Sequence, residues 1–395
     1  MTNIAIFCDG TWNNRDKTAV DTVIGRLEPA VRDVQDADGK DQLTHYEPGP
    51  GADAGLSGWQ QRVNSLRGGL LGRGLTRDIQ SCFEFLVKHY SPGDRIYIFG
   101  FSRGAYTARS LAGLLRTCGI PEDMADVPEA MRWYRDKSER AHPASDDSHA
   151  LRLRISPRVH TSAEELDWRR RQGAPEGVLL DIAYLGIFDT VGAHGVGGIL
   201  GQFKPIVGGH GFHDHDLSRL VQSGRHAVGL DETRVLFRPT KWTNLDDLNA
   251  DKGPDASGGE RFRQEWFPGD HSIVGGGGLE RGIADYAVQW VFEGAAVAGL
   301  RGDLEGHDLL SKKDHMGALT NGSAGFDLTQ LIRFPRRGPR PGEAHHLNPV
   351  ALRRLADDAS YRPASLRDIL LEGRKLIEAA LEVPADDQDA GHSAR

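Results

Sequence analysis

The stretch RIYIFGFSRGAYTARSLAGLL, residues 95–115, joins three patterns without a break. Residues 95–101 form an apolar run typical of a buried strand, and residues 105–117 have the pattern of a helix. Between them lies Gly100-Phe101-Ser102-Arg103-Gly104, a Gly-x-Ser-x-Gly sequence. A buried strand before this sequence and a helix after it are the setting of a nucleophile elbow, a sharp turn that exposes a serine at the carboxyl edge of a parallel sheet.

Strand and helix patterns alternate on both sides of this stretch. Strands are predicted at 3–8, 178–188, 234–240 and 263–267, and helices at 20–34, 75–90, 217–232 and 283–300. Near-continuous apolar strands that alternate with helices favour a mostly parallel sheet with helices on both faces. We therefore expect an α/β-hydrolase fold.

The expected domain covers residues 1–375. Within it, residues 121–177 are rich in charge, proline and histidine and carry only short helical pieces. They predict a cap-like insertion, placed either over the edge of the sheet or over its active face. Residues 376–395 are predicted to form a disordered tail.

A nucleophilic serine needs a base and a group that orients the base. In α/β-hydrolases the acid and then the histidine follow the serine along the chain. Asp189 ends the apolar run AYLGIF, and His271 follows the strand-like RQEWF, so each is predicted at the end of a later strand. We expect His271 to take the Ser102 proton and Asp189 to fix the imidazole tautomer.

Three other residues compete for these two roles. His226 and Asp231 lie in RHAVGLDE, where we expect them to hold a helix and a strand together. His194 is too near Asp189 in the sequence to come from a separate strand end.

The loop after the first strand, Asp9-Gly10-Thr11, raises the alternative of an aspartyl nucleophile. Phosphatases of that kind need a second carboxylate two positions away, and the residue two positions before Asp9 is Phe7. We therefore assign this loop to the oxyanion hole. One N–H comes from Arg103 and a second from Gly10 or Thr11. Asp9 is expected to hold the turn by accepting backbone N–H bonds.

The composition narrows the class of protein. The 395 residues are 38% hydrophobic and 26% charged, as in globular proteins, and a formal net charge of −8 argues against broad nucleic-acid binding. Basic clusters at 167–173 and 333–342 are interpreted as solvated surface. Cys8, Cys82 and Cys118 stand in apolar contexts and are interpreted as reduced core residues.

Signals for export and for a membrane span are weak in this sequence. The N-terminus has no basic region of a signal peptide, and no apolar stretch reaches the roughly 18 residues of a spanning helix. We expect a cytoplasmic protein, with export without a cleaved signal peptide left open.

No metal site and no cofactor are expected. The segment HGFHDHD, 210–216, has ligand-like residue types, but Gly211 breaks the spacing and no His-x-x-x-His helix face is present. Residues 66–75 lack the Gly-Lys-Ser/Thr ending of a phosphate loop. The four glycines at 275–278 are explained by close packing beside His271.

Seven blocks in order along residues 1–300 resemble a known family. They are FCDGTWN, YEPGPG, GLTRDI, SPGDRIYIFGFSRGAYTARSLAGLL, YLGIFDTVGAHG, LSRLVQSGRHAVGLDETR and WFPGDHSIVGGG. Together they resemble the uncharacterised α/β-hydrolase domain family whose best-known members are family-one phospholipase effectors of type VI secretion. The chain departs from the family pattern at Ile273, which replaces an aspartate, and at Gly278, which replaces a tyrosine.

The resemblance implies a Ser102–Asp189–His271 triad that acts on ester bonds, in known members those of membrane phospholipids. It also implies that the Asp-Gly-Thr-Trp loop flanks the active site. We expect a serine hydrolase acting on phospholipid acyl esters, with transient contact to a membrane surface. Two alternatives stay open, a cytosolic carboxylesterase for a small soluble ester and a non-catalytic binding domain that keeps the fold. An apolar cleft under the insertion would favour lipid, and a small closed pocket would favour a soluble ester.

Overall fold

The computed structural model describes residues 1–10, 21–36, 38–49, 70–191, 216–234, 237, 239–321, 336, 338–340, 342–367 and 369. In this part of the chain a six-stranded sheet has the order β2-β1-β3-β6-β7-β8, and every neighbouring pair is parallel. The strands are β1 (Asn3–Cys8), β2 (Leu43–Glu47), β3 (Arg95–Phe101), β6 (Ile182–Phe188), β7 (Gly224–Gly229) and β8 (Phe262–Phe267). The predicted α/β fold with a parallel sheet is confirmed.

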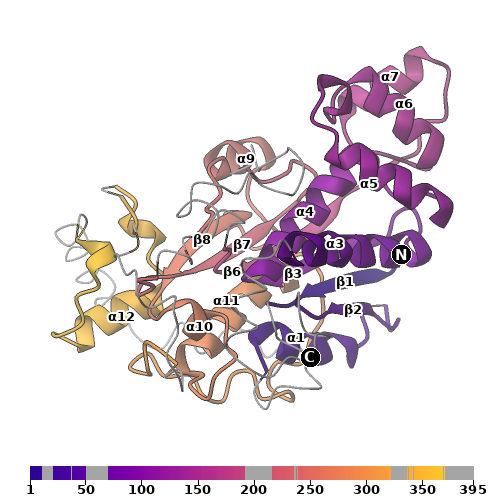
Figure 1. The fold of residues 1–395 in the computed structure, drawn as a ribbon. Coiled ribbons are helices and arrows are strands. Elements are labelled where there is room, and N and C mark those ends of the chain that lie inside the picture. Colours follow the sequence, from indigo (N-terminus) through magenta and orange to yellow (C-terminus); the bar gives the residue numbers. More distant parts are fainter. Residues whose placement is uncertain are drawn as a thin grey trace.

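Helices cover both faces of the sheet, as Figure 1 shows. They include α1 (Val23–Arg32), α3 (Leu70–His89), α4 (Arg103–Cys118) and α11 (Gly282–Val297). Because side chains alternate along a strand, Ile6 and Cys8 of β1 join the apolar core under α3 and α4. Ala5 and Phe7 join a second core under α1 and α11. The sheet is therefore buried on both faces, which explains the near-continuous apolar strands.

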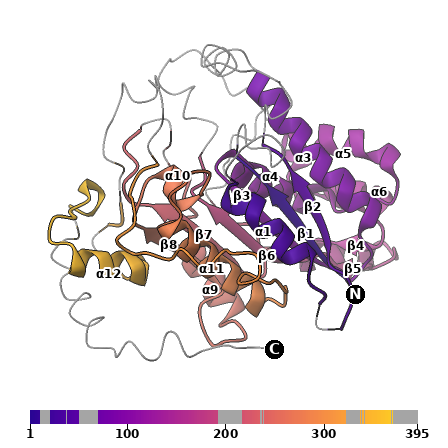
Figure 2. The same cartoon turned by 90° about the horizontal axis from the view of Figure 1, so that it is seen from below.

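The segment 121–177 packs at the amino-terminal edge of the sheet. It contains η2 (Met124–Asp126), α5 (Val127–Arg135), η3 (Glu139–Ala141), α6 (Asp146–Ile155), β4 (Val159–His160) and α7 (Ala163–Arg171), and β5 (Val178–Leu179) follows it and pairs with β4. It packs on α3 and α4, and it is bonded to the last turn of α4, where Arg152 donates to the Thr117 carbonyl (2.8 Å) and Ser156 Oγ to the Cys118 carbonyl (2.9 Å). Figures 1 and 2 both show α5 and α6 at the end of the molecule that holds the N-terminus, away from α10.

This placement decides between the two positions predicted for the insertion. Helix α4 begins beside Ser102 at the carboxyl edge of the sheet and carries the chain back to the opposite edge before the insertion starts. Residues 121–177 therefore lie over the amino-terminal edge and do not cap Ser102. A buried ion cluster holds the insertion together, with Glu165 2.6 Å from Arg152 and 2.7 Å from Arg169.

The remaining elements complete the far end of the sheet. They are α9 (Leu245–Lys252), α10 (His271–Val274), η6 (Ala344–His346), α12 (Pro349–Asp357) and η7 (Ala364–Leu366). Helix α12 is attached to β8, because Asn348 Nδ2 donates to Glu265 at 2.7 Å and Leu347 bridges to Trp266. No helix in the described part of the chain is both long enough and apolar enough to cross a membrane.

Two predicted elements are wrong. The helix expected at 217–232 is instead the strand β7, and all six of its residues are buried. Its position inside a parallel sheet outweighs a pattern that fits a helix equally well, since short apolar runs do not separate the two. The strand expected at 234–240 is absent among its described residues, where Pro239 makes only an isolated bridge to Val191. The tail at 376–395 lies outside the described residues.

Candidate active site

Ser102 occupies a strained turn between β3 and α4. Its backbone has φ 57° and ψ −117°, a left-handed φ that a side chain rarely adopts, and it is the residue before the first turn of α4. Its N–H donates to the Phe188 carbonyl at 3.1 Å, which continues the pairing between β3 and β6. The turn thus has the geometry of the predicted nucleophile elbow.

The glycines on either side of Ser102 are required by close backbone contacts. A Cβ on Gly100 would lie 2.5 Å from the Gly104 carbonyl oxygen, and one on Gly104 would lie 2.0 Å from the Cys8 carbonyl oxygen. Real Cβ atoms do not approach backbone so closely, so any larger residue would push the strand and helix apart. The Gly104 contact also places the end of β1, and with it Asp9, directly against the elbow.

Ser102, His271 and Asp189 form one hydrogen-bonded chain. His271 Nε2 lies 2.8 Å from Ser102 Oγ, and His271 Nδ1 lies 2.6 Å from Asp189 Oδ2. All three side chains are buried, Asp189 completely. The three residues come from the ends of β3 and β6 and the start of α10, so the sheet edge brings together residues that are far apart in sequence. This is the arrangement in which an imidazole can remove the serine proton.

The position of the His271 ring is fixed by hydrogen bonds of the surrounding backbone and by aromatic rings on two sides of it. Asp270 begins α10 by accepting the Ser272 and Ile273 N–H groups, and the His271 N–H donates to Glu232 at 3.2 Å. The rings of Phe101 and Phe237 each have their centroids 4.8 Å from the imidazole. These contacts fix the imidazole and exclude water from two sides of it.

Asp189 is an ionised carboxylate clamped in the interior. Its Oδ1 accepts the Gly229 N–H at 3.0 Å, and the Arg336 guanidinium donates to both carboxylate oxygens, with Nη2 at 2.9 Å from Oδ2. Burial alone would raise the pKa of Asp189, but the Arg336 charge and the hydrogen bond with His271 outweigh it and hold that pKa well below its usual range. Asp189 also has a positive φ of 35°.

Arg336 is the site residue that the sequence interpretation missed. The cluster RFPRRGPRPG was interpreted as solvated surface, yet Arg336 is only 6% exposed and also donates to the carbonyls of Gly229 and Phe237. A buried arginine needs a buried anion, and nothing in the sequence pairs this cluster with a residue 147 positions earlier.

The residues considered as rivals have other partners. His226 lies in β7, where its Nε2 accepts the Thr190 N–H at 3.3 Å and its Nδ1 is 3.0 Å from Gln264. Burial lowers its pKa to about 3, so it stays neutral. Asp231 accepts the Gly269 N–H (2.6 Å) and the Tyr361 hydroxyl (2.8 Å), so it joins two loop segments and not the predicted helix and strand. His194 lies outside the described residues.

The Asp9 carboxylate holds the end of the first loop through four hydrogen bonds. It accepts the Gly10 N–H at 2.6 Å, the Tyr46 hydroxyl at 2.7 Å and the Thr22 hydroxyl on both oxygens. The Gly10 N–H is thus used to fix the turn and is not directed to a substrate oxygen in this structure. Thr11 lies outside the described residues, and Arg103 is the first residue of α4, directly after Ser102.

The two departures from the family pattern leave the hydrogen-bonded chain intact. Ile273 is 1% exposed and belongs to the apolar core under α1 and α11, while Asp189 supplies the carboxylate for His271. At Gly278 a Cβ would lie 2.2 Å from the Asn321 side chain, which itself donates to the Ser272 carbonyl at 3.0 Å. Asn321 therefore takes the space that a larger residue at 278 would need.

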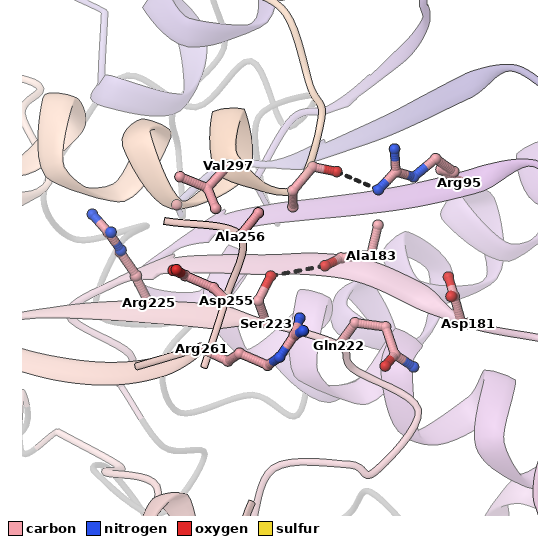
Figure 3. Close-up of a pocket in the computed structure, with 12 residues that line it drawn as sticks. Arg95, Asp181, Ala183, Gln222, Ser223, Arg225, Asp255, Ala256, Arg261 and Val297 are labelled. Carbon is pink, nitrogen blue, oxygen red and sulfur yellow. Dashed lines mark hydrogen bonds between the residues drawn. The ribbon is translucent and has the colours of Figure 1, made fainter. Parts of the chain in front are cut away.

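A pocket of about 290 Å³ lies at the amino-terminal edge of the sheet (Figure 3). Five of its twelve lining residues are charged, namely Arg95, Arg225, Arg261, Asp181 and Asp255. Arg95 and Arg225 are already bonded to the carbonyls at Ala298 and Trp290. Neither member of the Ser102–His271 pair lines this pocket, so it is separate from the candidate active site. The His-rich segment 210–215 lies outside the described residues.

Comparison with known proteins assigns the chain to a family. Residues 2–294 match the catalytic-domain family described as T6SS, Phospholipase effector Tle1-like. An uncharacterized protein of Saccharomyces cerevisiae, YEL023C, is 28% identical over 251 residues, which is 62% of this chain and 33% of that protein. The chain therefore spans about a third of the length of this curated relative.

Two solved structures are similar to the chain at low level. One is an uncharacterized protein from Pseudomonas aeruginosa, 15% identical with a TM-score of 0.40 over 98% of this chain and 60% of that one. The other is the Tle1 effector bound to the VgrG spike from the type VI secretion system, 17% identical with a TM-score of 0.34 over 70% and 51% of the two chains. These values are too low to argue from, and the family match carries the assignment. This chain belongs to the Tle1-like catalytic-domain family of type VI secretion phospholipase effectors.

Proposed function

We propose that the protein is a serine hydrolase that cleaves acyl esters of phospholipids, with Ser102 as nucleophile, His271 as general base and Asp189 as the orienting acid. The observation that carries the proposal is the unbroken path from Ser102 Oγ to His271 Nε2 (2.8 Å) and from His271 Nδ1 to Asp189 (2.6 Å) at a strained strand-to-helix turn. The substrate class is supported by the description of the family, whose members include phospholipase effectors.

Acylation begins when His271 accepts the Ser102 proton while Ser102 Oγ attacks the ester carbonyl carbon. The imidazolium that forms faces the ionised Asp189. The ion pair between Asp189 and Arg336 keeps this carboxylate deprotonated. When the tetrahedral intermediate collapses, His271 passes its proton to the leaving alcohol and an acyl-serine remains. A water that His271 deprotonates then releases the fatty acid and restores Ser102.

The negative oxygen of each tetrahedral intermediate is stabilised by backbone N–H groups. The Arg103 N–H is the first donor, since this residue follows the nucleophile at the start of α4. The second comes from the loop after β1, which contacts the elbow at Gly104. The sequence predicts Gly10 or Thr11 as this second donor; the Gly10 N–H is bonded to the Asp9 carboxylate, and Thr11 lies outside the described residues.

Labelling with a fluorophosphonate tests the nucleophile, because only an activated serine reacts. The parent protein is expected to be labelled and to release fatty acid from phospholipid vesicles, and Ser102→Ala is expected to do neither. Ser110→Ala is the matched control, since Ser110 is a buried serine in the same helix and lies two turns beyond the elbow. Absence of labelling in the folded parent would contradict the proposal and favour a binding domain. Labelling with turnover of p-nitrophenyl acetate but not of vesicles would contradict phospholipid as substrate.

A further inference from the structure

A second group of metal-ligating side chains lies between β1, β2 and α3, and it shares no residue with the Ser102–His271–Asp189 chain. His45, Glu47 and Cys82 each offer a ligand atom, and these atoms lie within 4.8 Å of one another. His45 Nε2 and Glu47 Oε2 are 3.2 Å apart. The cluster is nearly enclosed, with the Cys82 side chain fully buried and those of His45 and Glu47 21% and 11% exposed.

The sheet register explains why these residues meet. In the parallel β1–β2 pair Ile6 lies opposite His45 and Cys8 opposite Glu47. Tyr46 belongs to the other face, where it reaches Asp9, so His45 and Glu47 face α3. The ring of His45 stacks on Phe85 of α3 at 4.7 Å, one turn along from Cys82. Two strands and a helix therefore direct their side chains to one point.

A second sulfur lies next to Cys82, outside this group of three. Cys8 is 1% exposed, and its Sγ lies 3.8 Å from Cys82 Sγ. Two thiolates bound to one tetrahedral zinc ion at about 2.3 Å each lie about 3.8 Å apart, so the two sulfurs already have the spacing that such an ion imposes. Two sulfurs, an imidazole nitrogen and a carboxylate oxygen form a donor set that suits zinc better than magnesium or calcium, which prefer oxygen ligands alone.

We propose that His45, Glu47 and Cys82, with Cys8 as the fourth ligand, form a structural zinc site that ties β1 and β2 to α3. Binding releases the thiol protons of both cysteines to the solvent, because thiolates are the ligands. The site is built below the loop that carries Asp9, since Cys8 directly precedes Asp9 and the Asp9 N–H donates to the Glu47 carbonyl at 3.0 Å. The ligands come from three separate elements, so the sequence contains no Cys-x-x-Cys motif that would indicate the site.

Zinc titration of the reduced, metal-free protein in competition with a chromogenic chelator tests the proposal. We expect one zinc ion per chain and a higher melting temperature in its presence. Cobalt in place of zinc is expected to give the intense visible bands of a tetrahedral site and a thiolate charge-transfer band. His45→Gln, Glu47→Gln and Cys82→Ser are each expected to weaken zinc binding by more than about 100-fold. Losing a residue that only hydrogen-bonds to a metal ligand weakens binding by about 100-fold at most. Cys8→Ser is expected to reduce the thiolate band by half.

Two controls separate this site from other metal-binding residues. Cys118→Ser removes a buried cysteine outside the cluster and is expected to bind zinc as the parent does. Replacement of His210, His213 and His215 together by alanine is also expected to leave the cobalt spectrum unchanged. Loss of the zinc in that triple variant, or equal binding by Cys82→Ser that circular dichroism shows to be folded, would overturn the proposal. An unchanged thiolate band in Cys8→Ser would remove Cys8 from the ligand set.

Discussion

The hydrogen-bonded chain of the candidate active site has a serine end at Ser102 and an acid end at Asp189. Residues close in sequence hold the serine end in place, whereas residues far away in sequence hold the acid end. Around Ser102 the geometry comes from five consecutive residues, with Gly100 and Gly104 permitting a turn that packs against β1. Asp189, by contrast, is held by Gly229, His271 and Arg336, which follow it by 40, 82 and 147 positions.

The two ends also differ in the energetic cost that the surrounding structure must offset. At the serine end it is backbone strain, seen in the φ of 57° at Ser102, and the surrounding close contacts maintain that strain. At the acid end it is charge, because a fully buried carboxylate is stabilised by a buried guanidinium. Removing one partner of such a pair leaves an uncompensated charge, so the acid end is the more sensitive to changes far away in the sequence. Mutations at each end therefore have distinguishable effects.

The largest effect is expected at the serine end. Ser102→Ala removes the proposed nucleophile and is expected to leave the fold intact, since a methyl group fits wherever a hydroxymethyl does. Ester hydrolysis is expected to fall by ~10⁶-fold with an unchanged melting temperature. A rate for the variant within about tenfold of the parent rate, measured on a p-nitrophenyl ester, would remove Ser102 from its role.

A loss of the same order is expected for His271→Ala, and the comparison with His226→Ala tests which histidine is the base. His226 is completely buried against Gln264 and Trp242, so its removal leaves a cavity and lowers stability by about 2 to 4 kcal/mol. Its effect on the rate of the folded protein is expected to be far smaller than that of His271→Ala. The reverse order of the two rates would make His226 the base.

The difference between the two ends explains what the sequence could reveal. The elbow, β1, β3, α3, α4, β8 and α11 were predictable because strand, turn and helix patterns are local. Ser102, Asp189 and His271 followed from the order of residues at strand ends, and the structure brings these three together. The insertion at 121–177 was recognisable by composition, but its place at the amino-terminal edge depends on where α4 delivers the chain.

The parts that could not be predicted depend on contacts between distant segments. The sequence of β7 fits a helix and a strand equally well. Only its pairing with β6 and β8 requires an extended chain there. Arg336 reads as one of several surface arginines until it is placed beside Asp189. The meeting of His45, Glu47 and Cys82 is likewise a consequence of sheet register and helix packing.

At the acid end, Arg336→Gln is expected to lower the rate by less than the ~10⁴-fold that a triad aspartate carries, because Asp189 keeps its bonds to Gly229 and His271. Arg336 lowers the pKa of Asp189, so removing it raises that pKa. Since His271 needs an ionised Asp189, the variant is expected to lose activity at a higher pH than the parent on acidification. A pH–rate profile of kcat for the two proteins measures this.

Two variants separate charge from packing at this position. Arg336→Lys keeps one positive charge and is expected to retain more of the acid-side activity than Arg336→Gln. Arg340→Gln is the matched control, because Arg340 lies in the same basic cluster but is exposed. If activity falls over the same pH range on acidification in Arg336→Gln and in the parent, the Arg336 charge has no effect on the ionisation of Asp189 and the side chain contributes packing alone.

The smallest effect on the rate is expected at Asp9, which supports the serine end without touching the substrate. Asp9→Asn keeps an acceptor for Tyr46 but weakens the four hydrogen bonds that hold the turn. The loss in kcat is expected to stay below the ~10²–10³-fold of a deleted oxyanion donor, with KM little changed. Magnesium-dependent phosphatase activity that survives Ser102→Ala and disappears in Asp9→Asn would make Asp9 a nucleophile instead.

Asp9 also gives the serine end a pH dependence of stability with a sign opposite to that of Asp189. Burial raises the pKa of Asp9 from 3.8 to about 6, although hydrogen bonds from Tyr46, Gly10 and Thr22 oppose the shift. Between these two values the folded protein binds the proton that the unfolded chain has released, so this carboxyl makes stability fall as pH rises. The fall is on the order of 3 kcal/mol, and Asp9→Asn lacks it. The free energy of unfolding from urea titrations is therefore expected to shift in favour of the variant as pH rises from about 4 to about 6. A difference between the two proteins that does not change over this range would mean that Asp9 ionises in the folded protein as easily as in the unfolded chain.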